Sequence, residues 1–144
     1  MEQIVEKIKN RFGDKVQITV KTRERVFAQA EKEDLKEIIR YLFIDLGARM
    51  SIATAVDTRA AIEILYHMAF DQAKMVFSVR IQARKPEAEV DSITSIIEGA
   101  DWIEREIHEM FGVNFIGHPK LERLLLPDDW PEGEYPLLKK ESRE

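Results

Sequence analysis

The sequence predicts an α+β fold, in which helices cover one face of a largely antiparallel sheet and an extended arm ends the chain. Three observations lead to this prediction. Residues 35–46 carry an apolar stripe, residues 61–70 and 75–84 alternate apolar and polar side chains, and residues 127–144 hold three of the five prolines. Apolar side chains at i, i+3, i+4 and i+7 are typical of a helix, whereas strict alternation is typical of a half-buried strand. Because these patterns come in groups, they favour helices layered on an antiparallel sheet.

The N-terminal third begins with a short amphipathic helix over residues 2–12, which Gly13 closes. Period-2 alternation then predicts strands over residues 16–20 and 26–30. Asp34 and Glu37 have the spacing of a capping box, so we expect them to start the helix that carries the stripe over residues 35–46. Gly47 should end that helix.

The middle of the chain is expected to form three strands, over residues 50–56, 61–70 and 75–84, the last two forming a hairpin. One face of this hairpin is apolar and the other polar. An antiparallel sheet of this kind has one side that is solvated or covered by a partner. We then expect a short helix over Val90–Glu98, ended by Gly99.

A further helix is expected to start at Asp101, with Glu104 reaching back to its first turn as in a capping box. Its apolar stripe consists of Ile103, Ile107, Met110 and Phe111. Gly112 stands where a left-handed cap would end the helix. Gly117-His118-Pro119 should set a bend, with His118 as a hydrogen-bonded turn residue, and Leu121, Leu124 and Leu125 resume helical spacing until Pro127.

We therefore expect a single α+β domain over residues 1–126 and an extended C-terminal arm over residues 127–144. The arm carries Trp130, Tyr135, Leu137 and Leu138 without a periodic pattern that would bury them. Two alternatives follow: the arm docks on a partner, which we favour because exposed apolar side chains mark interaction sites, or it folds back on its own domain.

Composition excludes several classes of protein. With 44% hydrophobic residues the chain is not disordered, and a net charge of −5 disfavours nucleic acid as the main partner. No signal pattern and no apolar run of about 20 residues are visible, so we expect a chain that neither spans a membrane nor is secreted. The chain has no cysteine, which excludes disulfides and thiolate-held iron–sulfur clusters within it. Its 34% charged residues suit a thermophile, for which we expect a thermal midpoint above about 65 °C.

Candidate catalytic chemistry is confined to one helix. Glu104 and His108 are spaced i, i+4, as are Arg105 and Glu109, so each pair shares a face. Two carboxylates beside a histidine could perform acid–base chemistry, but an interface or solvated face with weak ion pairs is the more common arrangement. The histidines fit no usual metal-ligand spacing, and no nucleophile elbow or phosphate-binding loop is present. We therefore predict no catalytic, cofactor-binding or metal residue in this chain.

The C-terminal third carries several motifs in a fixed order. They are Glu104-Arg105-Glu106, Glu109-Met110-Phe111-Gly112, Gly117-His118-Pro119, a leucine-rich run and Pro127-Asp128-Asp129-Trp130. Together they resemble the signature of the 30-kDa subunit family of respiratory complex I, with its relatives in membrane-bound, energy-converting NiFe hydrogenases. The chain departs from the family pattern at Glu122, where a basic residue is usual, and over residues 136–140, where the family's Pro-Leu-Arg-Lys-Asp ending is changed.

The resemblance implies a cofactor-free, peripheral scaffold subunit of a complex I-related NiFe hydrogenase on the cytoplasmic side of the cell membrane. Its partners would be the large catalytic subunit and the iron–sulfur small subunit, which would hold the nickel–iron and iron–sulfur centres. By the same resemblance, the partner-binding residues are Glu104, Arg105, Glu106, Phe111, Gly112, Gly117, His118, Pro119, Arg123, Pro127 and Trp130. The alternatives are the equivalent subunit of NADH/quinone-type complex I and a small stand-alone enzyme that uses Glu104, His108 and Glu109.

Overall fold

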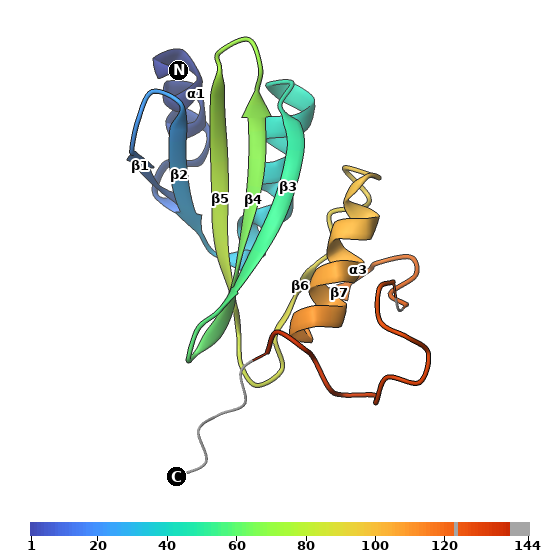
Figure 1. Ribbon diagram of the computed structural model, residues 1–144. Coiled ribbons are helices and arrows are strands. Elements are labelled where there is room, and N and C mark those ends of the chain that lie inside the picture. The colour runs from blue at the N-terminus through green and yellow to red at the C-terminus, as the bar shows by residue number, and fades with distance from the viewer. Residues whose placement is uncertain (123, 139–144) are drawn as a thin grey trace.

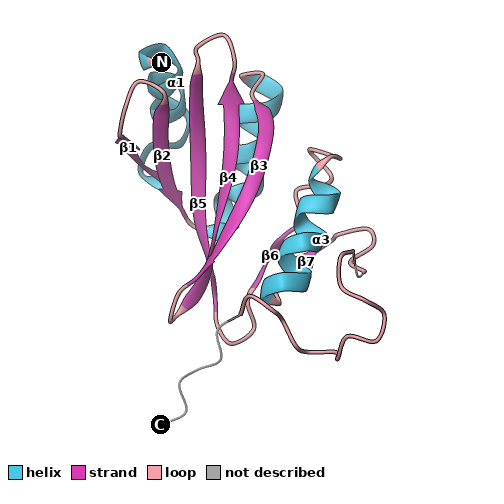
Figure 2. Ribbon diagram, viewed as in Figure 1, coloured by secondary structure: helices cyan, strands magenta, loops and turns pink. Residues whose placement is uncertain are grey.

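The computed structural model describes residues 1–122 and 124–138, and Figures 1 and 2 show its arrangement of helices and strands. The helices are α1 (Glu2–Phe12), α2 (Leu35–Arg40) and α3 (Ala100–Phe111), with short turns η1 (Gly13–Lys15), η2 (Lys32–Asp34) and η3 (Tyr41–Asp45). The strands are β1 (Val16–Val20), β2 (Arg25–Ala30), β3 (Arg49–Asp57), β4 (Ala61–Phe70), β5 (Met75–Arg84), β6 (Glu89–Asp91) and β7 (Asn114–Ile116). The predicted α+β class is confirmed. None of the helices described has the length and apolar character needed to cross a bilayer.

The main sheet has five strands in the order β1-β2-β5-β4-β3, and only the central β2–β5 pair is parallel. The predicted hairpin of β4 and β5 is confirmed, with Met68 opposite Phe77 and Ile64 opposite Ile81. In Figure 1 helices α1 and α2 lie behind this sheet, so one sheet face packs on helices. A second, smaller sheet consists of the parallel pair β6 and β7.

The core lies between the main sheet and the helices. The predicted stripe is confirmed: Leu35, Ile38, Ile39 and Leu42 are fully buried. They face sheet residues such as Phe77 within the same buried cluster. Burying each of these side chains contributes about 1.5–3 kcal/mol. The stripe extends past α2 because the chain continues from Arg40 directly into the wider turn η3.

Four local predictions are wrong. Val90–Glu98 does not form a helix, because residues 89–91 pair with β7 as strand β6. Leu121–Leu125 also lacks helical structure in its described residues. Neither predicted capping box forms. The Asp34 side chain accepts no hydrogen bond from the first turn of α2, and the residue that precedes α3 is Gly99, which has no side chain to accept one. Helix α3 starts at Ala100, so Asp101 is already inside its first turn.

The C-terminal arm has neither helix nor strand from Pro127 to Leu138, as expected of an extended arm. Figure 1 shows that it leaves the region of α3 in a wide loop and returns towards the lower end of that helix. The return is tied by a backbone hydrogen bond from Leu137 N–H to the Met110 carbonyl, 2.9 Å long. Over the described residues the arm therefore folds back on its own domain, and residues 139–144 lie outside the described part.

Candidate partner-binding surface

Helix α3 connects several segments of the described C-terminal part of the chain. It ends at Gly112, whose positive φ of 77° is the left-handed conformation predicted for this cap. Its side chains form hydrogen bonds with segments that precede and follow it in the sequence. Glu104 binds residues 92 and 93, and Glu109 binds residues 124–126. The helix therefore organises this region by hydrogen bonds to backbone groups as well as by its apolar stripe.

Glu104 lies inside the protein, with 1% of its surface exposed. Its carboxylate accepts hydrogen bonds from the Ser92 hydroxyl and from the Ile93 backbone N–H at 2.9 Å. Burial raises the pKa of this carboxyl, against the opposing effect of those hydrogen bonds. Burial also raises the pKa of the Tyr66 hydroxyl, and the nearby charge of Glu104 adds to that effect. Through these buried hydrogen bonds, Glu104 connects α3 to the segment that follows β6.

Glu109 holds the loop that follows β7. The residue is 5% exposed, and its carboxylate accepts three backbone hydrogen bonds, from the N–H groups of Leu124, Leu125 and Leu126 at 3.0, 2.8 and 3.0 Å. Successive N–H groups that converge on an anion form a nest, which is a strong way to order a loop. Arg105 supports the same loop, because its Nε donates to the Glu122 carbonyl at 3.2 Å.

His118 closes the bend between β7 and this loop. Its Nδ1 accepts from the Lys120 N–H at 3.0 Å, and its Nε2 lies 2.9 Å from the Asp101 carboxylate and 3.2 Å from the Asp101 carbonyl. The imidazole side chain is fully buried. The prediction of a hydrogen-bonded turn residue is confirmed, and the preceding Gly117 has the positive φ, 84°, that makes the bend possible.

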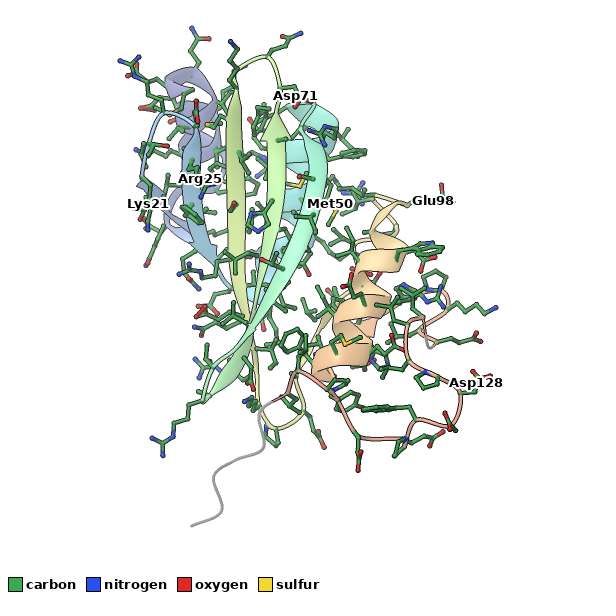
Figure 3. The ribbon with its side chains drawn as sticks, viewed as in Figure 1. Lys21, Arg25, Met50, Asp71, Glu98 and Asp128 are labelled. Atoms are coloured by element: carbon green, nitrogen blue, oxygen red, sulfur yellow. The ribbon has the colours of Figure 1, made fainter. Side chains whose placement is uncertain are left out.

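The arm packs on the other end of α3. A Cβ added at Gly112 would lie 2.7 Å from the Tyr135 ring, so glycine is required there for close packing as well as for its backbone angle. The Tyr135 ring also meets His108 at 6.4 Å between centroids. A cavity of about 420 Å³ lies between α3, the loop and the arm, lined among others by Glu122, Trp130 and Tyr135. Figure 3 places Asp128 at the outer bend of the arm.

These contacts occupy the groups that could have performed acid–base chemistry. Glu104 and Glu109 each bind a different backbone segment, and His108 Nδ1 donates to the Val113 carbonyl at 2.8 Å. The three side chains therefore face three different segments of the chain. Within residues 1–122 and 124–138, no three His, Asp or Glu side chains are grouped so that they could hold a metal ion.

The predicted partner-binding residues differ in their exposure. Glu104 and His118 are internal contacts, whereas Glu106, Gly117, Pro119 and Pro127 are exposed. Arg105, Phe111, Gly112 and Trp130 are partly buried, and Arg123 lies outside the described residues. The α3 region also exposes apolar side chains that the sequence-based prediction does not include: Trp102 is 65% exposed, Leu125 60% and Ile116 47%. Trp102 interrupts the polar face of α3, which is the sequence signal that could have identified it.

Known proteins resemble the chain over nearly its whole length. The model of the family described as "Respiratory-chain NADH dehydrogenase, 30 Kd subunit" matches residues 28–143. An NADH-quinone oxidoreductase subunit of Citrifermentans bemidjiense is 32% identical over 141 residues, which covers 92% of this chain and 88% of that protein. Membrane-bound hydrogenase subunit beta of Pyrococcus furiosus is 34% identical over 144 residues, with 94% and 83% coverage. A chain in the structure of the membrane-bound sulfane sulfur reductase, described as an archaeal respiratory membrane complex, matches with a TM-score of 0.85 at 25% identity, with 94% and 81% coverage.

Proposed function

The chain belongs to the 30-kDa subunit family of the respiratory-chain NADH dehydrogenase, and from this premise we propose that it is a peripheral, cofactor-free scaffold subunit of a complex I-related NiFe hydrogenase. Its partners are the large catalytic subunit and the iron–sulfur small subunit, which hold the nickel–iron and iron–sulfur centres. The chain supports the large subunit on the cytoplasmic side of the membrane. Electrons pass beside it, since it has no cysteine to ligate a cluster.

The observation that carries this proposal is the apolar surface that α3 and its loop expose. Trp102 and Leu125 project from a framework that Glu104 and Glu109 hold by internal hydrogen bonds. Tryptophan is enriched among the residues that dominate binding energy at protein interfaces, and truncating such a residue commonly costs about 2–4 kcal/mol of affinity. A framework ordered before binding loses less conformational entropy when the partner docks.

Two relatives support different parent complexes. The likeness to a membrane-bound hydrogenase subunit of Pyrococcus furiosus favours the hydrogenase. The equally extensive likeness to an NADH-quinone oxidoreductase subunit makes NADH/quinone-type complex I the second candidate. In both cases the role of this chain is the same, and the parent complex differs in the metals of its other subunits.

The test is purification of the tagged chain from a mild-detergent extract of its native cells, followed by mass spectrometry and metal analysis. Nickel together with iron and membrane subunits is expected for the hydrogenase, and iron without nickel for complex I. Trp102→Ala should lower the yield of co-purified subunits at least about tenfold. Ile44→Ala is the matched control, because Ile44 is a 56%-exposed apolar residue in η3. A solitary, metal-free chain would refute the scaffold proposal.

The stand-alone enzyme is separated from the scaffold by His108→Gln. A glutamine amide can still donate to the Val113 carbonyl, so the scaffold should assemble as before. An enzyme that used His108 for proton transfer would lose turnover.

A further inference from the structure

The main sheet has a second face that no helix covers among the described residues. Figure 1 looks onto this open sheet face, which we define as the side chains of β1–β5 that alternate with the core residues. The strand register aligns them in rows across all five strands. One row consists of Gln17, Gln29, Arg80, Leu65 and Thr54.

The charge of this face is opposite to that of the chain. The residues that alternate onto it include Arg25, Arg49, Arg80 and Arg84 against the single acidic residue Glu63, in a chain whose net charge is −5. Arg49 is paired with Asp71 through two contacts of 3.1 Å, and Glu63 lies 3.9 Å from Arg80, so Arg25 and Arg84 on β2 and β5 carry the remaining positive charge. Figure 3 labels Arg25 on β2. His67 adds no charge near neutral pH, because burial and the charge of Arg25 lower its pKa.

A hollow of about 70 Å³ lies beside Arg80 on this face, lined by Gln17, Thr19, Phe27, Ala28, Gln29 and Arg80. It is large enough for several water molecules. The Arg80 Nε atom is buried and makes no hydrogen bond with any residue of the described part, its nearest acidic oxygen being that of Glu63 at 3.9 Å. Two amide side chains and a hydroxyl therefore line the hollow together with Arg80, whose Nε makes no hydrogen bond to a described residue.

We propose that this hollow receives a carboxylate side chain from an acidic surface of a neighbouring subunit, and that the open sheet face is a second docking surface of the chain. A guanidinium binds a carboxylate through two parallel hydrogen bonds, and Gln29 and Thr19 can donate further ones. The phenyl ring of Phe27 supplies an apolar side of the hollow. This inference rests on membership of a multi-subunit complex, but it uses none of the residues of α3 or the arm.

The test measures binding of the purified full-length chain to detergent-solubilised membranes from cells that lack it. Two variants change the hollow: Arg80→Gln removes its charge, and Gln29→Glu adds a negative charge at its rim. Lys7→Gln is the matched control, since Lys7 is exposed on α1 behind the sheet. Both hollow variants should weaken binding about tenfold or more, with Lys7→Gln unchanged. The loss should shrink between about 0.1 M and about 1 M salt, because the Debye length falls from about 10 Å to about 3 Å.

Each outcome decides the inference. If Trp102→Ala abolishes binding while both hollow variants bind like the wild type, the scaffold function stands and the second docking surface is refuted. If the wild-type chain itself does not bind, both proposals fall. Light scattering of the purified chain tests a further outcome, a dimer that Arg80→Gln abolishes. That result would assign the open sheet face to a second copy of the chain and would also overturn the inference.

Cross-linking identifies the carboxylate directly. Arg80→Lys places a primary amine at the hollow, and a water-soluble carbodiimide activates a carboxylate so that it condenses with that amine to an amide while the carbodiimide leaves as a urea. A cross-linked peptide that joins residue 80 to an Asp or Glu of another subunit is expected. A link only to Glu63 of the same chain would contradict the proposal.

Discussion

Glu109→Gln tests whether the buried carboxylate holds the loop that the proposed scaffold presents. In the wild type, one carboxylate oxygen accepts from Leu124 and Leu126 N–H, and the other accepts from Leu125 N–H. The glutamine amide has only one oxygen. If that oxygen keeps the bonds to Leu124 and Leu126, the amide NH₂ group faces the Leu125 N–H, donor against donor.

The magnitude follows from these three bonds. Hydrogen bonds to a charged group are worth about 1.5–3 kcal/mol each and neutral ones about 0.5–1.5, so two weakened bonds and one lost bond sum to about 4 kcal/mol in a dry site. Leu125 is 60% exposed, and water can therefore solvate the released N–H groups. We expect a local loss of about 2 kcal/mol, which is about thirtyfold in the equilibrium for loop opening.

Amide hydrogen exchange on the purified chain measures this opening. Exchange at Leu124–Leu126 should be about thirtyfold faster in Glu109→Gln, whereas the β4 and β5 amides keep their protection because the loop opens locally. Glu106→Gln is the matched control, since Glu106 is an exposed glutamate on the same helix. Unchanged protection of the loop in Glu109→Gln, or an equal loss in Glu106→Gln, would refute the role assigned to Glu109.

The remaining predictions concern three other contacts of α3. Gly112→Ala should lower the free energy of unfolding by about 1–2 kcal/mol for the positive φ alone, and by more if Tyr135 cannot move, as urea unfolding would measure. Because burial raises the Glu104 pKa in the folded state, its contribution to stability is greatest below the ordinary value of 4.5 and is lost as pH rises through the folded pKa. Glu104→Gln should remove this part of the pH dependence of unfolding, and an unchanged profile would contradict it. Arg105→Ala should weaken complex assembly while the isolated chain keeps its melting temperature, so a large fall in melting temperature with normal assembly would make Arg105 a residue of the fold.

The elements that the sequence predicts well are those whose burial repeats with a regular period. The stripe that begins at Leu35 and the alternation around Phe77 each report which side of one element is buried, and both patterns agree with the structure. Gly112 is predictable for a similar reason, because a left-handed cap strongly favours one residue type.

The errors occur where a distant contact outweighs a local preference. Ile93, Ile96 and Ile97 have helical spacing, yet the Ile93 N–H is bound by Glu104 and the residues before it pair with β7. Glu104 has the spacing of a capping box, but its carboxylate turns away from its own helix towards Ser92. The nest around Glu109 joins residues 15 to 17 positions apart, and no local pattern reports such a contact.

Part of the candidate site is predictable from sequence and part is not. The motifs indicate that residues 104–130 act together, and side chains of α3 do contact His118, Glu122 and Leu124–Leu126. The sequence cannot separate the inward-facing Glu104 from the outward-facing Glu106, because only the packing of α3 on β3 and β7 decides which side is buried.

The parallel pairing of β2 with β5 has a consequence for the order of folding. Val26 pairs with Phe77, so β2 has no neighbour on that edge until β3, β4 and β5 have been synthesised. Closing so long a loop delays this step relative to the local hairpins. On the ribosome, the β1–β2 hairpin must therefore wait with one edge unpaired, whereas β4 and β5 can join as soon as both have emerged. A chain terminated between β4 and β5 would release two incomplete halves of a sheet rather than a smaller stable domain.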